Sequence, residues 1–430
     1  MRINIQDLTV GMYVSELDRP WLETPFLFQG FEIMADSDIK ELSRYCKFVF
    51  IDADQSRPGS LTHAREHAQD QALEPENTLR EGSRPIRDKK IEFEILKKSV
   101  APKQDQAYQD ITTLDEEVGR VSSTFKFAKN LISEIMDNVR LGHSVNIGGV
   151  KQVVTELAES VIRNPDALTC YSQLKNHDQY TAEHSMRVSI LAMVFGRHLG
   201  MDKAHLELLG TGGLLHDVGK MKTPLEILNK PGELTQAEAR IMEDHVPHGV
   251  RILENSGGIP DPSMEVVRCH HERYDGTGYK SGLKSDTIGQ FGLIGGIVDF
   301  YDAVTSDRCY RKGIPAHVML REMYKQRGQS FDPHLVEQFI QCIGVYPIGS
   351  VVELNSGDIG VVTNINRERR LKPKIRLILK PDHKPYTTAK IVDLTTDRSE
   401  KGKLFDIGAV VEAEKYHINP HKYLPTALEA

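Results

Sequence analysis

Apolar positions repeat at two different spacings along the chain, and the changes in spacing divide it into regions. In residues 111–345 they recur every three or four positions, which predicts amphipathic helices, whereas residues 1–53 and 346–430 contain short stretches typical of strands. Residues 54–110 are polar and too poor in apolar side chains to form a core. We therefore expect a mainly α, multidomain protein: a small N-terminal α+β module, a polar mobile linker, a central all-α helical bundle and a small β-rich C-terminal region.

Two amphipathic helices are predicted at the start of the helical region. The first has an apolar stripe over residues 118–139, and the second has one over residues 153–162. The second helix should stop near Asn164, because Pro165 disfavours helical geometry in the residue before it. We expect the first stripe to pack against the rest of its own domain, since about three heptads is short for an independent coiled coil. A homodimer formed through that stripe is the alternative.

The two flanking regions have their own predicted elements. In the N-terminal module, a helix is expected at residues 39–43 and a strand at residues 47–51. In the C-terminal region, residues 350–354 and 359–362 are expected to form a hairpin around the turn at 356–358. This last region contains no cluster of chemistry-bearing residues in its sequence, so its expected role is structural or regulatory.

Composition and charge exclude several classes of protein and site. The 430 residues include 39% hydrophobic and 27% charged residues, and a net charge of -7 provides no field that attracts long nucleic acid. No apolar run reaches the length of a membrane span and the first residues lack a signal peptide, so a cytoplasmic protein without a membrane partner is expected. The five cysteines are scattered and form no Cys-x-x-Cys pair, so any metal site must use histidine and carboxylate ligands.

Histidine and aspartate residues gather on five predicted helical segments between residues 180 and 311. These are His184, then His216-Asp217, then His245 with His248, then His270-His271, and finally Asp299 with Asp302. A lone histidine on an apolar face is usually an ordinary core residue, so no single segment is diagnostic. Five inward-facing segments within about 120 residues nevertheless indicate a metal site.

The spacing of these residues indicates which metals the site suits. Consecutive helical side chains point about 100° apart, so His270 and His271 suit two neighbouring ions better than one. Asp299 and Asp302 lie in an apolar segment, where a buried carboxylate requires a cation or a hydrogen-bond partner. Imidazole and carboxylate without thiolate suit iron, manganese, zinc or nickel, and we expect iron or manganese.

The motifs resemble those of the HD-GYP phosphodiesterases, metal-dependent phosphohydrolases of the HD superfamily. The resemblance covers about residues 171–345 and rests on His184, His216-Asp217-x-Gly219-Lys220, His245, His270-His271-Glu272-Arg273-x-Asp275-Gly276-x-Gly278-Tyr279, Asp299-x-x-Asp302-Ala303 and Arg308-x-Tyr310-Arg311. The N-terminal module, with Gly11-Met12-Tyr13-Val14, also resembles a domain often attached to this family.

The resemblance implies a set of site residues. The implied ligands of two divalent ions are His184, His216, Asp217, His245, His270, His271 and Asp299, with Asp217 bridging the ions. The implied catalytic residues are His216, Asp217 and Lys220, and Lys220, Arg308 and Arg311 are expected to hold phosphate.

The implied activity is hydrolysis of cyclic di-GMP in bacterial signalling. A hydroxide that bridges two metal ions would attack phosphorus in line and give linear pGpG, with GMP after a second cut. Two alternatives remain open. One is hydrolysis of cyclic GMP-AMP by the same chemistry, and the other is a non-catalytic module that binds a cyclic dinucleotide or a signalling partner protein.

Three positions depart from the family pattern. Lys280 replaces the proline of the Gly-Tyr-Pro signature, which removes a rigid turn residue. Gly292-Leu293 replaces an Ala-Arg pair in a glycine-rich stretch, which we expect to loosen the helix that carries Asp299. Tyr180 stands where members with a third metal carry a carboxylate, so two metals are expected.

Three further roles stay open in the sequence. Asp302 is either a packing carboxylate satisfied by backbone or a partner of a ligand, and His248 is expected to be a bystander. Glu272 and Arg273 are candidates for a local ion pair beside the site.

Overall fold

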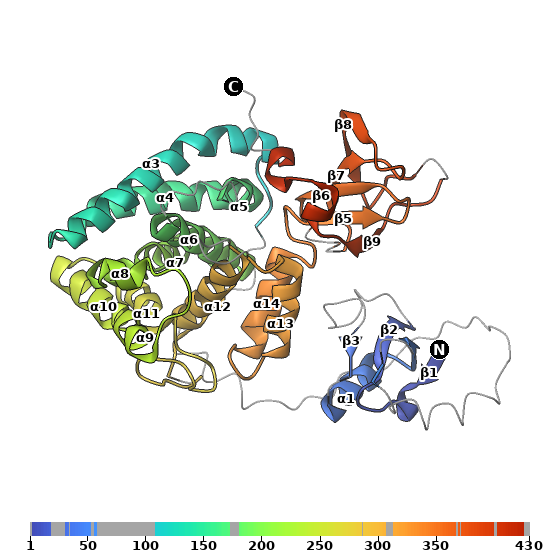
Figure 1. Ribbon diagram of the computed structural model, residues 1–430, viewed down its shortest axis with the longest axis horizontal. Coiled ribbons are helices and arrows are strands. Elements are labelled where there is room, and N and C mark those ends of the chain that lie inside the picture. Colours follow the sequence, from blue (N-terminus) through green and yellow to red (C-terminus); the bar gives the residue numbers. More distant parts are fainter. Residues whose placement is uncertain are drawn as a thin grey trace. The chain divides into compact units, whose positions relative to one another are not determined.

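The chain forms two compact units, Met1–Glu94 and Ile95–Ala430, which we describe separately. The structure is a computed structural model that describes residues 2–18, 31–33, 35–52, 56–57, 108–172, 180–285, 287–306, 313–366, 369, 371–399 and 402–424. The polar linker expected over 54–110 lies almost entirely outside these residues. Figure 1 gives the element labels used below.

The first unit contains a four-stranded sheet and one helix. Its elements are β1 (Arg2–Asn4), η1 (Ile5–Asp7), β2 (Tyr13–Leu17), β3 (Phe31–Glu32), α1 (Asp36–Tyr45) and β4 (Phe48–Asp52), and the strand order is β1-β4-β2-β3. Leu42 of α1 is fully buried with Val14 and Val49 of the central strands. The predicted helix and following strand are thus confirmed.

A helical bundle makes up most of the second unit (Figure 1). Its elements are α3 (Leu114–Arg140), α4 (Ile147–Arg163), α5 (Pro165–Ser172), α6 (Tyr180–His198), α7 (Lys203–Leu215), η4 (Val218–Lys222), α8 (Leu225–Leu228), α9 (Gln236–Glu243), α10 (His245–Ser256), α11 (Asp261–Cys269), α12 (Gln290–Thr305), α13 (Ala316–Lys325) and α14 (Pro333–Ile343). Helix α6 packs against α7 and α12 and also contacts α3, α4 and α5, so it lies at the centre of the bundle.

The long helix α3 buries its apolar stripe within the chain. Val118, Ile132 and Val139 are each at most 1% exposed, and the helix contacts α4, α5, α6 and η4. This is the intrachain packing that the sequence predicted. The helix that follows, α4, ends at Arg163 with Asn164 as its C-cap, which confirms the predicted stop before Pro165.

Glycines in α12 allow it to approach α11 closely. A Cβ at Gly292 would lie 2.7 Å from Cβ of Cys269, and one at Gly295 would lie 2.7 Å from Cγ1 of Val266. Helix α12 is continuous from Gln290 to Thr305. The expectation that its glycines loosen the helix was therefore wrong, because they are needed for close packing between two helices that carry site residues.

One predicted helical stripe is interrupted. The spacing of Ile241, His245, His248 and Ile252 predicts one stripe on a single helix, and α9 opens with a capping box at Thr235. The helix instead breaks at Asp244, where α9 ends and α10 begins, and Ile241 is 42% exposed. Only the part in α10 faces inward, where His245 is 1% exposed.

The C-terminal part of the second unit is a five-stranded antiparallel sheet in the order β8-β7-β6-β5-β9. Its elements are β5 (Val351–Leu354), β6 (Ile359–Asn364), β7 (Lys374–Leu379), β8 (Pro385–Asp393), β9 (Ile407–Val410), η5 (Ala413–Tyr416) and η6 (Pro420–Tyr423). The predicted hairpin is the β5–β6 pair, and Gly357 adopts a φ of 87° in its turn. Val351 and Val361 share a core with Val118 of α3 and Cys170 of α5, so the sheet packs on the helices.

No helix among the described residues has the length and apolar character needed to cross a membrane.

Candidate metal centre

Seven histidine and aspartate side chains converge in the helical bundle as two groups. One group is His184, His216 and Asp299, and the other is Asp217, His245, His270 and His271; within each group the potential ligand atoms all lie within 4.8 Å of one another. These are the seven residues that the family resemblance implied as metal ligands. Three of them lie in α6, α10 and α12, two lie between α7 and η4, and two directly follow α11.

Asp217 lies between the two groups. Its Oδ2 is 3.3 Å from Nε2 of His216 and 3.6 Å from Nε2 of His184, whereas its Oδ1 is 3.4 Å from Nε2 of His245. Each carboxylate oxygen therefore faces a different group. This is the arrangement that a carboxylate shared by two cations requires.

A glycine allows the elements that carry these residues to pack closely. His216 is the C-cap of α7 and Asp217 is the N-cap of η4, which packs on α10. A Cβ at Gly219 of η4 would lie 1.9 Å from the carbonyl oxygen of His245. Any larger residue at this position would push η4 away from α10 and separate Asp217 from His245.

Hydrogen bonds at Nδ1 fix the direction of several rings. His216 donates from Nδ1 to the carbonyl of Gly213 at 2.7 Å, and His245 does so to Met242 at 2.7 Å. His270 uses Nδ1 in the same way, 3.1 Å from the carbonyl of Val267. In the neutral form of each ring, these bonds select the tautomer whose Nε2 has a lone pair that faces the centre.

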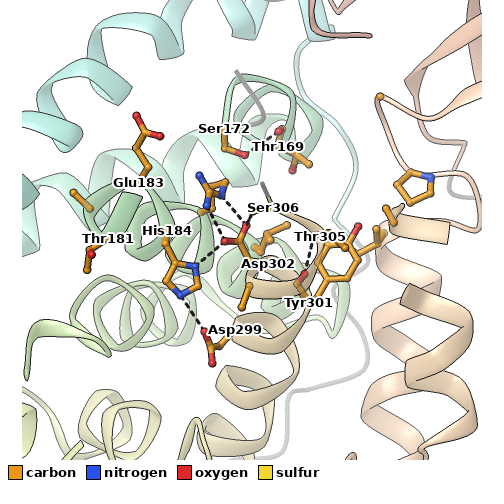
Figure 2. Close-up of a pocket in the computed structure, with 18 of the residues that line it drawn as sticks. Thr169, Ser172, Thr181, Glu183, His184, Asp299, Tyr301, Asp302, Thr305 and Ser306 are labelled. Atoms are coloured by element: carbon orange, nitrogen blue, oxygen red, sulfur yellow. Dashed lines mark hydrogen bonds and ion pairs between the residues drawn. The ribbon is translucent and has the colours of Figure 1, made fainter. Parts of the chain in front are cut away.

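His184 is oriented by a carboxylate instead of a carbonyl. Its Nδ1 lies 2.7 Å from Oδ2 of Asp302, and its Nε2 lies 3.0 Å from Oδ1 of Asp299 (Figure 2). Asp302 also accepts from Nε and Nη2 of Arg187 at 2.7 and 3.0 Å. Asp302 is therefore held by side chains and not by backbone alone, which decides the alternative left open by the sequence.

Sequence reasoning missed Arg187. It lies three residues after His184 on α6, and that spacing places both side chains on one face of the helix. An arginine on the same face as a proposed ligand is the signal that could have identified it.

The charges of the buried groups suit metal binding. Burial raises the pKa of Asp217, but His216 and Lys220 outweigh it and hold that pKa well below its usual range. Burial also raises the pKa of Asp299, but His184 and His216 outweigh it and hold that pKa well below its usual range. Burial lowers the pKa of His245 to about 4 and that of His270 to about 3, so both rings are neutral at neutral pH.

The pKa of His216 shifts in the opposite direction. Burial alone would lower it, but the carboxylates of Asp217 and Asp299 outweigh that effect and raise it to about 10. A ring so close to two buried carboxylates is held in a field that attracts positive charge.

Two buried atoms at the centre lack hydrogen-bond partners. Nε2 of His216 and Oδ1 of Asp217 are buried and have none among the residues that the structure describes. Such atoms are rare in folded proteins, because a buried polar atom without a partner is destabilising. Cations bound by these two atoms would satisfy both, so the residues present fit a metal centre.

Of the three cations expected to bind phosphate, the structure describes Lys220. Lys220 donates from Nζ to Oδ2 of Asp217 at the edge of the centre. Arg308 and Arg311 lie outside the described residues. The centre opens into a cavity of about 1250 Å³, whose lining includes His184, Lys220, His271 and Asp299.

The loop after His271 is held by contacts that the sequence did not reveal. Glu272 is buried and accepts from the backbone N–H groups of Ser281 and Leu283 at 2.8 and 3.0 Å. The expected ion pair between Glu272 and Arg273 is not among the contacts of the described residues. Arg273 instead donates to the carbonyl of Glu272 at 2.9 Å, because the carboxylate of Glu272 is directed to the loop.

Tyr279 and Lys280 of the same loop contact a proposed ligand and the residue before another ligand, respectively. The ring of Tyr279 stacks on His271 with centroids 4.5 Å apart, and Nζ of Lys280 lies 2.6 Å from Oδ1 of Asp244. Asp244 immediately precedes His245. The lysine that replaces the expected proline thus ties the loop to the start of α10. His248, the expected bystander, belongs to neither ligand group.

Three segments of the chain match known families. Residues 1–150 match a domain of unknown function, residues 169–335 match the HD domain, and residues 351–400 match a KOW domain associated with the HD domain. The first match extends past α3, and the second begins in α5.

Several known proteins are similar to the chain. A cyclic di-GMP phosphodiesterase from Pseudomonas aeruginosa is 32% identical over 395 residues, which cover 91% of this chain and 88% of that protein. Another from Thermotoga maritima is 34% identical over 192 residues, covering 44% of this chain and 52% of that protein. A 3'3'-cGAMP-specific phosphodiesterase from Vibrio cholerae is 34% identical over 162 residues, covering 37% and 31%.

Proposed function

The chain belongs to the HD-GYP family of cyclic dinucleotide phosphodiesterases, and from this premise we propose that it hydrolyses cyclic di-GMP at a two-metal centre. The observation that carries the proposal is the position of Asp217, whose two oxygens face two different groups of ligands. The similarity to the cyclic di-GMP phosphodiesterase of Pseudomonas aeruginosa supports the choice of substrate.

The seven side chains divide between two divalent ions, for which we propose iron or manganese. His184, His216 and Asp299 would hold one ion, while His245, His270 and His271 would hold the other, with Asp217 shared. Nitrogen and oxygen ligands without thiolate suit these metals. When bound, two such ions lower the pKa of a water molecule toward neutrality and offset the negative charge of a phosphodiester.

The chain's own residues would position the substrate for attack. Lys220 lies at the edge of the centre, where its Nζ contacts Asp217, and we propose that it moves to a non-bridging phosphate oxygen when substrate binds. Arg308 and Arg311 are proposed to assist it. Water would add at phosphorus as one ester bond to a ribose oxygen breaks, so the ring opens to linear pGpG. A second hydrolysis would give GMP.

A side-by-side substrate assay tests the proposal. The full chain, purified without oxygen and analysed for metal, is incubated with cyclic di-GMP and with 3'3'-cyclic GMP-AMP, and products are separated by chromatography. Release of pGpG by protein that contains about two metals per chain is the expected result. Metal-loaded protein that leaves both compounds intact would contradict the proposal and favour a module that binds without cutting.

Cyclic GMP-AMP is the second candidate substrate, because a Vibrio cholerae relative is named as specific for it. Faster turnover of this compound than of cyclic di-GMP would change the substrate and leave the metal chemistry intact.

A further inference from the structure

One wall of the cavity comes from outside the part of the chain that matches the HD domain. Ser133, Met136, Asp137 and Arg140, all in α3, line the same cavity as the ligand groups. Helix α3 lies within residues 1–150, whereas the HD match begins at residue 169. A ligand in the cavity can therefore contact side chains that the HD domain itself does not supply.

Apolar side chains line the cavity next to this wall. Met221 of η4, Leu225 and Leu228 of α8 and Leu234 line the cavity together. Leu225 is 49% exposed, so it presents apolar surface to a ligand in the cavity. Apolar walls with few polar groups suit a flat aromatic ring better than a phosphate, which needs several donors.

This region adjoins the metal centre. Nη2 of Arg140 lies 3.5 Å from Sδ of Met221, and Met221 directly follows Lys220, which contacts Asp217. A nucleotide whose phosphate is held at Lys220 would have its attached base within reach of α3.

Arg140 differs from the other cavity-lining cations in its partners. Lys220 is paired with Asp217, and Arg187 is paired with Asp302. Among the described residues, no carboxylate lies within ion-pairing distance of Arg140, although Asp137 also lines the cavity one turn earlier on α3. An arginine and an aspartate are thus presented to the same cavity without being paired to each other.

We propose that this wall binds a guanine base of the substrate and that Arg140 and Asp137 determine the preference for guanine over adenine. A guanidinium can donate to O6 and N7 of guanine together, and a carboxylate can accept from its N1–H and 2-amino group. Adenine carries a donor where guanine has O6, and it lacks both donors that Asp137 would accept. The inference rests on the proposed function, since the phosphate at the metal centre places the base.

The test compares cyclic di-GMP with cyclic di-AMP in four variants of the full, manganese-loaded chain. The variants are Arg140→Ala, Arg140→Lys, Asp137→Asn and Lys126→Ala. Lys126 is an exposed cation on the same helix that does not line the cavity, which makes its variant the matched control.

The inference predicts a selective loss. Arg140→Ala should lower kcat/KM for cyclic di-GMP by about tenfold or more, mainly through KM, because it removes one bidentate contact to the guanine base. The kcat/KM of Arg140→Ala for cyclic di-AMP should stay within about twofold of the wild-type value, because an adenine base does not form the bidentate hydrogen bonds with Arg140. Arg140→Lys should fail to restore the preference for guanine, since the lysine ammonium lacks the planar pair of donors needed for a bidentate hydrogen bond. Asp137→Asn should reduce the preference, and Lys126→Ala should match wild type.

Other outcomes separate failure of the inference from failure of the proposed function. Turnover of cyclic di-GMP that is unchanged in Arg140→Ala overturns the inference and leaves the function standing. An equal loss for both nucleotides, rescued by Arg140→Lys, also overturns it, because it indicates a phosphate contact. If the wild-type chain cuts neither nucleotide, the proposed function fails. Calorimetric binding of the two nucleotides to wild type and Arg140→Ala then decides the inference, and only a selective loss for cyclic di-GMP supports it.

Discussion

Asp302 accepts a hydrogen bond from Nδ1 of His184 at 2.7 Å, and the same carboxylate accepts two from Arg187. The hydrogen bond between His184 and Asp302 joins α6 to α12, and α12 also carries Asp299. One buried carboxylate therefore holds a proposed ligand ring, an arginine and a second ligand-bearing helix in place.

Replacement of Asp302 should weaken metal binding. Asp302→Asn should lower metal affinity by about tenfold to a hundredfold, because the amide supports the His184 ring less well than a carboxylate does. Metal titration with atomic absorption measures this. Ser306→Ala is the matched control, since Ser306 contacts the same carboxylate at 3.4 Å and belongs to neither ligand group. Equal metal affinity in wild type and Asp302→Asn would show that the contact only packs the helices.

Lys220→Ala should affect the substrate and spare the metals. Loss of the ammonium removes a phosphate-binding cation, so KM should rise and kcat should fall, with unchanged metal content. Lys222→Ala, an exposed lysine in the same short helix η4, should behave as wild type. Loss of metal from Lys220→Ala would show that its contact with Asp217 is structural.

Gly295→Ala should destabilise the bundle and release metal. Its new Cβ would lie 2.7 Å from Cγ1 of Val266 and would push α12 from α11, separating Asp299 from His270. Overpacking of this kind costs about 1–3 kcal/mol. Gly119→Ala in α3 is the control, because nothing lies within 4 Å of its Cβ position and the substitution favours helix. Urea unfolding of both variants measures the difference, and equal stability of the two would rule out the close-packing explanation.

Glu117→Gln should reduce stability in a way that depends on pH. Glu117 is fully buried and accepts from Nε and Nη2 of Arg163 at 2.9 and 2.8 Å. Burial raises its pKa, but the hydrogen bonds and charge of Arg163, with a hydrogen bond from Thr112, outweigh this and lower it. The folded carboxyl therefore has a lower pKa than the unfolded one, so its contribution is present above the unfolded pKa and is lost as pH falls through the folded pKa.

At pH 7, Glu117→Gln should lower the free energy of unfolding by about 1–3 kcal/mol. The gap to wild type should shrink at pH 3, because the unfolded carboxyl takes up a proton more readily than the folded one as the pH falls. Glu134→Gln, on an exposed position of the same helix, should change little at either pH. A gap that is constant between pH 3 and 7 would contradict the ion-pair explanation.

The sequence predicted which histidine and aspartate side chains converge, because each of them carries a local signal. His184 lies on an apolar helix face, and His216-Asp217 is followed by a glycine that packing requires. The contacts that orient these ligands were harder to predict, since they join residues far apart in the chain, such as His184 with Asp302. The break at Asp244 was missed for a similar reason: the apolar spacing continues through it, and only the packing of η4 on α10 ends the stripe.

The wall formed by α3 could not be predicted at all. The apolar stripe of α3 correctly predicted the buried face of the helix. Asp137 and Arg140 lie outside that stripe, where charged residues are usual on any solvated helix. Only the tertiary arrangement shows that they border the cavity.

The most direct test of the two-metal account is the double variant His216→Ala with Asp217→Ala. Each residue contributes an unsatisfied atom to the centre, so their removal should empty the site and abolish hydrolysis of cyclic di-GMP. Circular dichroism should show the helical content of wild type. Hydrolysis at the wild-type rate by the folded, metal-replete double variant would contradict the account.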